Sequence, residues 1–418
     1  MNKYVETIIV GGGQAGLAAS YYLSQAKRPH LILERSPHAA HAWRDQRWDS
    51  FTLVTPNWTV RMPGAEYDGP DPKGFLTRDQ VVEYLEQYVA RFRLPVRYGV
   101  KVTSVRRRPH GYYLINTSAG TYESYNVIVA TGLYQGPKIP TFADRIPPQI
   151  RQMHSSEYRN PGALPAGAVV VVGAAQSGTQ IAEELYLSGR RVFLSVGRTL
   201  RTPRRYRGRD VHEWSQLLGM WDRTVEQLRS PKEKFEVHPT ISGRAGGRSL
   251  NLHQFARDGV VLMGRLQDVR DGEMVLAPDL SDHLAEADQF ESKLTQVIDK
   301  YVAEECIDAP GEALPKLNDG YMAPKILRLD LGANHITSVI WATGYRFDYS
   351  MIHLPVRDAD GYPIQRRGIS RFPGLYFLGM PWLHSRKSSI LLGVAEDAAY
   401  VADHIIVSTR LEKLGIAS

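Results

Sequence analysis

Three glycines with the spacing G-x-G-x-x-G stand near the start of the chain, in GGGQAG, directly after the apolar stretch TIIV. In such a turn the first glycine (Gly11) permits a tight bend, and the second (Gly13) lets the backbone approach a pyrophosphate. The third (Gly16) lets a helix pack close to a strand. Glu34 ends the next apolar stretch, where a carboxylate can accept hydrogen bonds from a ribose diol. Together these residues predict a dinucleotide-binding site.

A second set of the same kind lies in the middle of the chain, in AVVVVGAAQSGTQ. Gly173 and Gly178 repeat the first and third glycines, while Ala175 replaces the second and reduces the closeness of approach to a pyrophosphate. Gln176 and Ser177 lie inside the turn and are predicted to contact the ligand. The repeat predicts a second nucleotide site.

The nucleotide preference of the second site follows from what stands after its second apolar stretch. The position that corresponds to the glutamate of the first site is Val196, and Arg198 follows two residues later. A carboxylate would repel a 2′-phosphate and a guanidinium would attract it, so Arg198 predicts NADP(H) rather than NAD. Arg201, Arg204 or Arg205 would supply a second contact from the following loop.

The stretch RTLRTPRRYRGR carries six arginines, and two other interpretations of it stay open. It could be a solvated basic face or a peripheral contact with a membrane. Nucleic-acid binding is disfavoured, because the stretch directly follows a nucleotide-binding unit and no helix-turn-helix, zinc or RNA-binding signature is recognised elsewhere.

Each glycine turn must be held between a strand and a helix. The β-branched apolar residues before each turn are typical of a buried parallel strand, and helical composition follows each turn. Two further apolar stretches end in Ala-Thr-Gly, at 130–132 and 342–344, and are expected to carry the chain between domains. The predicted fold is α/β, with two Rossmann-like dinucleotide-binding domains and the NADP(H) domain inserted into a discontinuous FAD domain.

The domain boundaries are predicted from the linkers. Residues 1–162 and 331–418 are assigned to the FAD domain and residues 163–330 to the NADP(H) domain. The Pro/Gly-rich segments NPGALPAG and NDGYMAPK are the predicted linkers. Residues 283–305 place apolar side chains on one helical face among acidic residues, which predicts an amphipathic surface helix.

Composition excludes some classes of protein. A length of 418 residues suits two domains, and 51 basic against 44 acidic residues is a small excess of charge. The single cysteine, Cys306, excludes an intrachain disulfide, a Cys-x-x-Cys redox pair and a cysteine-rich metal site, and no metal is expected. The start of the chain has no leader-like segment, and the apolar runs are shorter than the roughly 20 residues that span a bilayer. We therefore expect a soluble cytoplasmic protein without an integral membrane segment.

With these features the chain resembles the flavin-containing monooxygenases over nearly its whole length. The likeness is to a bacterial branch of that family and rests on WRDQRWDSFTLVTPNW, GFLTRDQVVEYLEQY, PRRYRGRD and PGLYFLGMPWLHSRKSSILLGVAEDAAYVADHI. It implies FAD and NADPH as cofactors. It also implies that the helix beginning in GVAEDAA points its positive N-terminal end at the flavin pyrimidine ring.

The resemblance and the glycine turns together give two sets of predicted binding residues. The backbone near Val102 would meet adenine, and Trp43 and Arg44 would lie along the ribose and pyrophosphate. The residues predicted to hold FAD are Gly11, Gly13, Gly16, Glu34, Arg35, Trp43, Arg44, Val102, Thr131, Gly132 and Gly379. Those predicted to hold NADP(H) are Gly173, Gln176, Ser177, Gly178, Arg198 and Arg205.

The identifying motif of the family, Phe-x-Gly-x-x-x-His-x-x-x-aromatic, is only half present. His154 and Tyr158 have the right spacing, but Pro148 and Ile150 stand where Phe and Gly belong. The predicted catalytic roles are that His154 helps to keep NADP⁺ in place and that Asn57 hydrogen-bonds near the flavin. The alternative for His154 is a purely structural role.

The resemblance implies an FAD-dependent, NADPH-consuming monooxygenase. A flavin C4a-hydroperoxide would oxygenate a small nucleophile containing nitrogen or sulfur, so the partners are a small-molecule substrate and O₂, and a homodimer stays open. Two rivals share every cofactor motif. One is an NADPH-dependent flavin reductase or dehydrogenase that does not use O₂ productively, and the other is a non-catalytic nucleotide-sensing flavoprotein.

Overall fold

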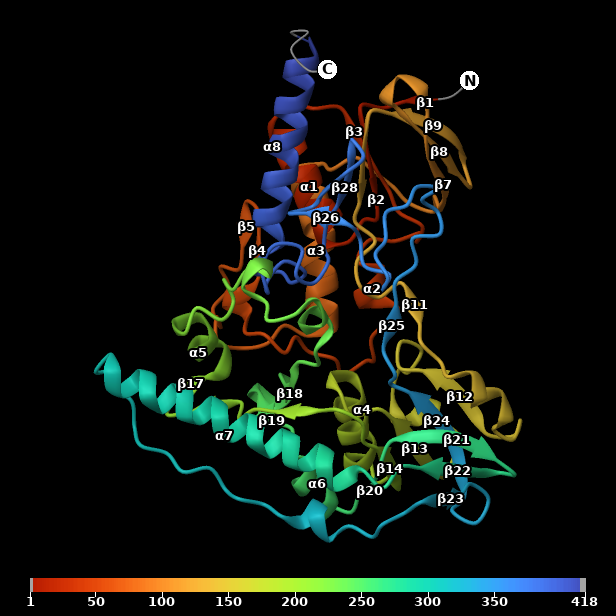
Figure 1. Ribbon diagram of the computed structural model, residues 1–418, viewed down its shortest axis with the longest axis vertical. Helices are drawn as coiled ribbons and strands as arrows, with labels where there is room; N and C mark the ends of the chain where they lie inside the picture. The colour runs from red at the N-terminus through yellow and green to blue at the C-terminus, as the bar shows by residue number, and fades with distance from the viewer. Residues whose placement is uncertain (1–2, 414–418) are drawn as a thin grey trace.

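The chain forms two sheet-based units stacked along the long axis of the molecule, as the computed structural model shows for residues 3–413 (Figure 1). The first unit contains the N-terminal and C-terminal parts of the chain, and the second contains the middle part. The helices are α1 (Gln14–Gln25), α2 (His41–Arg44), α3 (Arg78–Phe92), α4 (Gln176–Leu187), α5 (Val211–Leu217), α6 (Leu252–Arg257), α7 (Leu280–Glu304) and α8 (Val394–Lys413).

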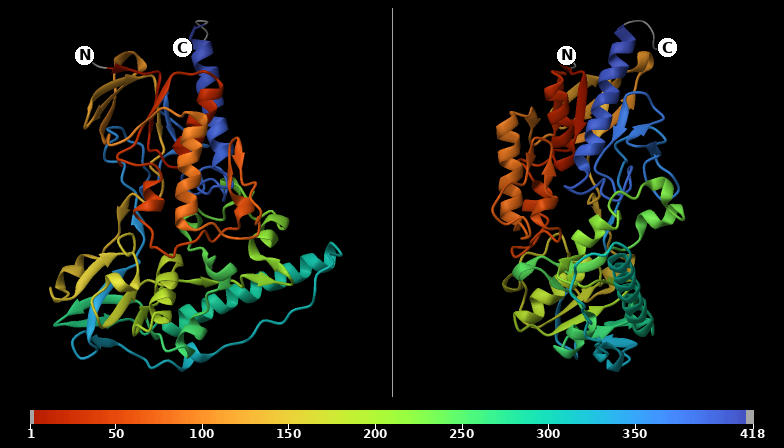
Figure 2. Two further views of the ribbon diagram at one scale, coloured as in Figure 1. Left: turned by 180° about the vertical axis from the view of Figure 1, so that it is seen from behind. Right: turned by 90° about the vertical axis from the view of Figure 1, so that its left-hand side faces the viewer.

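A seven-stranded sheet forms the centre of the first unit, in the order β26-β27-β28-β10-β2-β3-β6. Its strands are β2 (Thr7–Val10), β3 (His30–Leu33), β6 (Val96–Arg97), β10 (Asn126–Val129), β26 (Gln365–Arg366), β27 (Ile369–Ser370) and β28 (Leu375–Phe377). Strand β2 pairs in parallel with β3 and β10, and all its residues are buried, as its apolar sequence predicts. Helices α1 and α8 pack against each other in this unit (Figure 2).

A five-stranded parallel sheet forms the centre of the second unit, in the order β12-β24-β13-β14-β20. Its strands are β12 (Arg151–His154), β13 (Ala168–Val172), β14 (Val192–Ser195), β20 (Val261–Met263) and β24 (Ile336–Trp341). The predicted amphipathic helix is confirmed as α7, which begins slightly earlier than expected. It buries Leu284, Ala287, Leu294, Ile298 and Val302.

The smaller sheets complete the two units. The first unit contains β1 (Lys3–Tyr4), β7 (Val102–Arg107), β8 (Tyr113–Thr117) and β9 (Gly120–Ser124), with the pair β4 (Arg61–Met62) and β5 (Ala65–Glu66). The second unit contains β15 (Leu200–Arg201), β16 (Arg205–Tyr206), β17 (Arg209–Asp210), β18 (Pro239–Ser242), β19 (Arg248–Ser249), β21 (Leu266–Arg270), β22 (Glu273–Leu276) and β23 (Arg328–Asp330). Within residues 3–413, no helix is long and apolar enough to cross a membrane.

The two Ala-Thr-Gly sequences lead into the crossings between the units. The first follows β10 and leads to β11 (Gly136–Pro137), and the second follows β24 and leads to β25 (Tyr345–Arg346). Strands β11 and β25 pair with each other in antiparallel fashion, between the two units (Figure 1). The chain therefore leaves and re-enters the first unit at one place, as the sequence predicts.

The predicted domain boundaries at 162/163 and 330/331 are wrong. Strand β12 precedes the first boundary and β24 follows the second, yet both belong to the five-stranded sheet, where β24 pairs with β12 and β13. The segment 160–167 is therefore a loop inside the second unit, and 318–325 precedes β23 in the same unit. Linker composition marks loops, whereas long-range strand pairing decides which unit a segment joins.

Candidate cofactor and active site

The first glycine turn connects β2 to α1 and fits a pyrophosphate. Gly11 has φ +108°, and a Cβ there would lie 2.6 Å from the carbonyl oxygen of Ala130. A Cβ at Gly16 would lie 2.0 Å from the carbonyl oxygen of Gly11. Beside Gly13, in contrast, the space within 4 Å of a built Cβ is open. The turn is thus closed where the chain must pack and open where a ligand must approach.

The second turn, between β13 and α4, repeats this packing. Gly173 has φ +105°, and a Cβ there would lie 2.5 Å from the carbonyl oxygen of Ala342. A Cβ at Gly178 would lie 1.8 Å from the carbonyl oxygen of Gly173. Gln176, predicted to contact the ligand, instead donates from Nε2 to the carbonyl oxygen of Ile241 (2.5 Å). Its side chain therefore ties the turn to β18.

Helices α1 and α4 both begin without a side-chain cap. Their N-caps are Gly13 and Ala175, and neither helix has an acidic residue in its first turn. Ser177, in the first turn of α4, is half-buried. The first N–H groups of each helix are thus available to an anionic ligand, which the helix dipole also favours.

Glu34 follows β3 and lies against the first glycine turn. Its Oε2 accepts a hydrogen bond from the backbone N–H of Gly12 (2.7 Å), and its Oε1 accepts one from the N–H of Ser36 (2.8 Å). These two bonds fix the carboxylate beside the open space of the turn. A carboxylate at this position can accept hydrogen bonds from the hydroxyl groups of a bound ribose.

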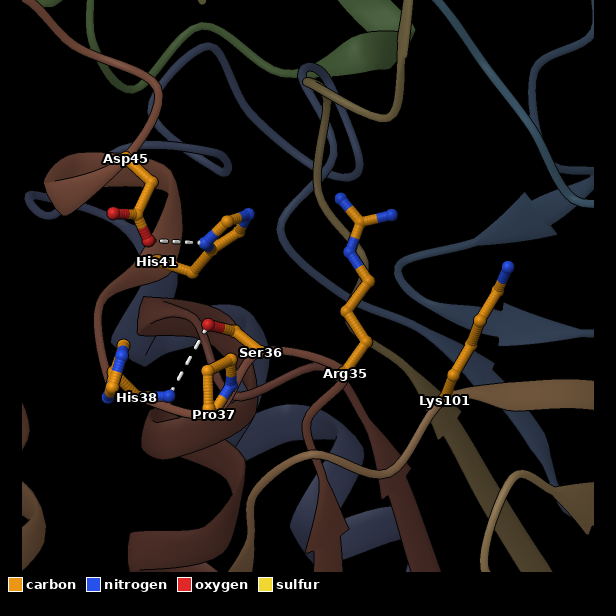
Figure 3. A pocket seen from close by; sticks show the side chains of 7 residues that line it. All are labelled: Arg35, Ser36, Pro37, His38, His41, Asp45 and Lys101. Carbon is orange, nitrogen blue, oxygen red and sulfur yellow. Dashed lines mark hydrogen bonds and ion pairs between the residues drawn. The ribbon is translucent and has the colours of Figure 1, made fainter.

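A pocket of about 440 Å³ begins at Arg35, the residue that follows Glu34 in the sequence (Figure 3). Its lining residues are Arg35, Ser36, Pro37, His38, His41, Asp45 and Lys101. The N–H of Val100 donates to the carbonyl oxygen of Glu34 (2.9 Å), which brings Lys101 and Val102 to the end of β3. The pocket therefore suits the adenosine half of a dinucleotide.

Trp43 and Arg44 lie in the short helix α2. The Trp43 ring lies 5.9 Å from the Phe51 ring, and Arg44 pairs with Glu86 of α3 (2.5 Å). The Arg44 guanidinium is thus held in an ion pair with a carboxylate of α3. Its predicted place along the pyrophosphate would require that exposed ion pair to open.

The C-terminal part of the chain also reaches the start of α1. Gly379 has φ +73°, and a Cβ there would lie 2.7 Å from the Cβ of Ala15. Gln14 donates from Nε2 to the carbonyl oxygen of Ser389 (2.8 Å). On the other side of the turn, Thr131 Oγ1 accepts a hydrogen bond from Gln135 Nε2 (2.9 Å), which also donates to the carbonyl oxygen of Gly132 (2.8 Å).

Helix α8 begins next to this region, but its first turn is acidic. It contains Glu396 and Asp397. Asp397 is only 2% exposed, and burial raises the pKa of its carboxyl to about 6. The positive helix end expected at the flavin pyrimidine ring is therefore partly offset by these carboxylates above pH 6.

The buried carboxyl of Asp397 predicts a pH-dependent effect on stability. Its pKa is higher in the folded chain than in the unfolded chain, so its stabilising contribution is present below about pH 4 and is lost as the pH rises to about 6. We expect Asp397→Asn to raise the free energy of unfolding by about 1–3 kcal/mol at pH 8 and to leave it unchanged at pH 4. Urea denaturation at both pH values measures this. Glu396→Gln is the matched control, and an equal gain at both pH values would contradict the prediction.

The arginine-rich stretch is mostly paired with acidic residues, many of them on α7. The pairs are Arg198 with Glu286, Arg201 with Asp288 and Glu291, Arg204 with Asp210, and Arg207 with Asp299. Arg205 is exposed and donates to the carbonyl oxygens of Gly246 and Gly247. The interpretation as a solvated basic face is therefore wrong for most of the stretch.

Arg204 in particular is not placed to contact a 2′-phosphate. It is 1% exposed, its Nε donates to Asp210 Oδ2 (2.7 Å), and its Nη1 donates to the carbonyl oxygen of Val54 (2.6 Å). Its guanidinium also lies over the Phe75 ring at 4.2 Å. Arg198, in contrast, is 48% exposed after β14, where its Nε lies 2.8 Å from Glu286 and its Nη2 3.9 Å from Glu236.

The structure favours a structural role for Asn57, in place of the predicted catalytic one. Its Nδ2 donates to the carbonyl oxygen of Asp71 (2.9 Å), and its Oδ1 accepts a hydrogen bond from the N–H of Leu76 (2.7 Å). The side chain is buried, and both ends of its amide hold its own loop together. A short polar residue between strands carries no sequence signal that separates these two roles.

His154 also has the geometry of the structural alternative. The fully buried ring donates from Nε2 to the carbonyl oxygen of Gly344 (3.0 Å), and its Nδ1 pairs with Ser156 Oγ (2.9 Å). Burial lowers its pKa, so the ring is neutral at pH 7. Tyr158 donates to Glu184 Oε2 (2.8 Å) in the core of the second unit. Half of the family motif thus anchors β12 to the crossing.

One cluster at the crossings was not predicted from the sequence. The guanidinium of Arg47 lies 4.6 Å from the centroid of the Tyr134 ring, which packs edge-on against Tyr345 at 4.9 Å. Tyr345 also packs against His154 at 4.8 Å. The available signal was the tyrosine that follows each Ala-Thr-Gly sequence. In the described part of the chain, no group of His, Cys, Asp and Glu could hold a metal ion.

Comparisons with known proteins agree with this geometry. Residues 8–215 match the family model described as pyridine nucleotide-disulphide oxidoreductase. A protein of Geobacillus kaustophilus described as an uncharacterized oxidoreductase CzcO-like is 32% identical over 408 residues, which cover 97% of this chain and 99% of that protein. YUCCA1 of Arabidopsis thaliana, described as a probable indole-3-pyruvate monooxygenase, is 33% identical over 43% of this chain and 44% of its own.

Among solved structures, the flavin-containing monooxygenase from Stenotrophomonas maltophilia has the same fold. It superimposes with a TM-score of 0.65 at 19% sequence identity, over 97% of this chain and 99% of that chain.

Two glycine turns, each at the end of a strand with parallel neighbours, lie on two sheets joined by one crossing and define an oxidoreductase with two dinucleotide-binding sites. The chain belongs to the same family as the CzcO-like oxidoreductase of Geobacillus kaustophilus.

Proposed function

We propose that this protein is an FAD-dependent monooxygenase that consumes NADPH and oxygenates a small nucleophile containing nitrogen or sulfur. The reaction takes NADPH, a proton, O₂ and the substrate. It yields NADP⁺, water and a product that carries one oxygen atom of O₂. The observation that carries this proposal is the pair of uncapped helix starts, at Gly13 and Ala175, on two sheets that meet at the β11–β25 crossing.

The residues on the first unit suit FAD. The open space at Gly13 would take the pyrophosphate, Glu34 the ribose diol, and the pocket at Arg35 the adenosine end. The segment from Gly379 to Ser389 would adjoin the flavin end. When bound, FAD supplies hydride acceptance and reaction with O₂. The protein binds and orients both nucleotides and excludes water from their contact.

The residues on the second unit suit NADPH. The start of α4 would take its pyrophosphate, and Arg198 its 2′-phosphate. Because Glu286 now holds the Arg198 guanidinium, a bound 2′-phosphate would have to displace that carboxylate. Arg201 and Arg207, which pair with carboxylates of α7, would keep the loop in place.

This arrangement predicts opposite effects for two variants. We expect Arg198→Ala to raise the KM for NADPH about 10- to 100-fold with little change for NADH, because a charge-assisted contact is lost. Glu286→Gln should lower the KM for NADPH several-fold, because the competing carboxylate is removed. Flavin reduction under anaerobic conditions measures both. Arg106→Ala, an exposed arginine on β7, is the control. If Arg198→Ala affects NADPH and NADH equally, Arg198 does not bind the 2′-phosphate.

The use of O₂ is tested by stopped-flow spectroscopy of the NADPH-reduced protein mixed with oxygen. The proposal predicts a long-lived flavin C4a-hydroperoxide and, with an amine or thiol substrate, a low ratio of H₂O₂ released to NADPH consumed. Oxygen-independent turnover with an organic acceptor would instead establish the reductase or dehydrogenase. Bound nucleotides without any turnover would establish the sensing protein.

A further inference from the structure

The parallel strands of the first unit all begin at one edge of their sheet. Strands β3 and β10 run parallel to β2, β6 runs parallel to β3, and β28 runs parallel to β10. The first glycine turn and Glu34 follow the carboxyl ends of β2 and β3, and β10 leads at its carboxyl end to the second unit. The opposite edge, termed the amino edge, therefore faces away from the nucleotide turn and the second unit (Figure 1).

Exposed basic residues stand shortly before most of these strands, and so they gather at the amino edge. Lys3 precedes β2, Lys27 precedes β3, Arg91 and Arg93 precede β6, and Arg371 precedes β28. All five side chains are exposed. Within residues 3–413 none of them forms an ion pair with a carboxylate. The topology of the sheet thus brings together cations that are far apart in the sequence.

Three consecutive arginines at the end of β7 lie at the same edge. Arg106, Arg107 and Arg108 are exposed, and in the described part of the chain no carboxylate pairs with them. Arg107 lies opposite Tyr113 across the β7–β8 pair, and the Tyr113 hydroxyl donates to the carbonyl oxygen of Pro373, shortly before β28 (2.7 Å). The end of β7 therefore extends the basic surface of the amino edge.

The charge of this surface is one-sided. Between Glu86 and Glu123 the sequence contains seven basic residues and no Asp or Glu. Glu6, which precedes β2, is already paired with Arg28 (2.8 Å). Glu123 on β9 and Asp403 on α8 offset part of the charge. The arginines of the stretch 198–209, in contrast, mostly pair with carboxylates, so an excess of unpaired positive charge distinguishes the amino edge.

Exposed tyrosines and the end of α8 lie among these cations. Tyr4, directly after Lys3, and Tyr125, directly before β10, are 59% and 47% exposed, and their rings pack edge-on at 5.8 Å. Helix α8 packs along α1 and ends at the same edge (Figure 2). Val407, near the end of α8, is 53% exposed. Tyrosine, with an apolar ring and a polar hydroxyl, suits the boundary between water and lipid headgroups.

We propose that the amino edge of the first unit binds the surface of a membrane that contains anionic lipids. Clusters of several basic side chains bind such surfaces, and each additional Lys or Arg strengthens the binding. An acidic protein would match the charge equally well, but it would not account for exposed tyrosine and valine side chains beside the cations, which gain by contact with lipid. Both glycine turns would stay open to solution. This inference does not depend on the proposed reaction.

Sedimentation of the FAD-loaded protein with lipid vesicles tests the inference without NADPH or a substrate. Vesicles of phosphatidylcholine with about one-third phosphatidylglycerol are compared with vesicles of phosphatidylcholine alone, at about 0.05 M and about 0.5 M NaCl. We expect the anionic vesicles to bind at least about 10-fold more tightly at low salt. Most of this preference should be lost at high salt, because the contact is electrostatic and exposed.

Two triple variants with the same change in net charge separate the amino edge from the general attraction of a basic protein. A variant with Arg106→Gln, Arg107→Gln and Arg108→Gln should bind the anionic vesicles at least about 10-fold more weakly. The matched control replaces by Gln three arginines of the second unit whose side chains are each 65% exposed: Arg265, Arg270 and Arg328. The control should lose no more than about 2-fold, because these arginines lie far from the proposed contact.

Several outcomes would overturn the inference. These are equal binding to the two kinds of vesicle, no binding to either, and equal losses in the two triple variants. Binding of poly-L-glutamate or of duplex DNA as tightly as the anionic vesicles would assign the surface to an acidic protein or to nucleic acid instead. If the triple variant of β7 does not fold, Tyr125→Ser takes its place. It should weaken vesicle binding several-fold, and an unchanged affinity would contradict the inference.

Discussion

A Gly13→Asp variant is expected to fold normally and to be recovered without FAD. The backbone of Gly13 is extended, and no atom lies within 4 Å of a Cβ built there, so a side chain is sterically tolerated. An aspartate would fill the open space at the start of α1 and place a negative charge where the pyrophosphate must lie. We expect the Kd for FAD to rise at least about 100-fold, equivalent to about 3 kcal/mol or more.

The measurement is the flavin content after gel filtration, followed by titration of the apoprotein with FAD. Gly311→Asp is the matched control, because Gly311 is exposed and also has nothing within 4 Å of a built Cβ. Far-UV circular dichroism shows whether the fold persists. A yellow Gly13→Asp protein with full flavin content would place the FAD pyrophosphate elsewhere.

An Arg204→Leu variant is expected to lose about 3–5 kcal/mol of stability, because it leaves the Asp210 carboxylate buried without its partner. The pair is enclosed in the second unit, and burial lowers the pKa of Arg204 and raises that of Asp210. Asp210 also caps α5 by accepting a hydrogen bond from the N–H of His212 (2.9 Å). The loss therefore extends from one ion pair to the helix and to the loop at Val54.

The neighbouring residue supplies the control for this prediction. Arg205 is exposed and bonds only to carbonyl oxygens, so Arg205→Leu should change the free energy of unfolding by no more than about 0.5 kcal/mol. Guanidinium denaturation followed by circular dichroism compares the two variants. If both lose the same small amount, the pair of Arg204 with Asp210 contributes little to the fold.

The arginine-rich stretch has two uses, one in the proposed binding of NADPH and one in the fold. Arg198, shortly after β14, is half-exposed and pairs with two surface carboxylates, Glu286 and the more distant Glu236, which a ligand can displace. Arg201 and Arg204 are enclosed by carboxylates and backbone and serve the fold. The arginines of this stretch look alike in the sequence, but their burial differs, and burial decides which of them a ligand can reach.

The sequence by itself determined the two nucleotide turns and the α/β class. The requirements for Gly16 and Gly178 are local, because a Cβ at either would meet the carbonyl oxygen of the first glycine of its own turn. Gly11 and Gly173 are needed locally for their positive φ, so the spacing alone shows all four positions. The apolar strands on either side of each turn are equally local signals. The expected preference for NADP(H) over NAD, which depends on Arg198 and Val196, stays a prediction.

Only the tertiary structure decided the domain boundaries and the partners of the polar residues. Strand β24 pairs with β12 and with β13, both distant from it in the sequence, and no local composition reports this pairing. The amide of Asn57, the ring of His154 and the guanidinium of Arg204 are all satisfied by groups that the fold brings to them. Whether a polar side chain is satisfied or available depends on long-range packing, because burial and hydrogen-bond partners come from segments that are distant in the sequence.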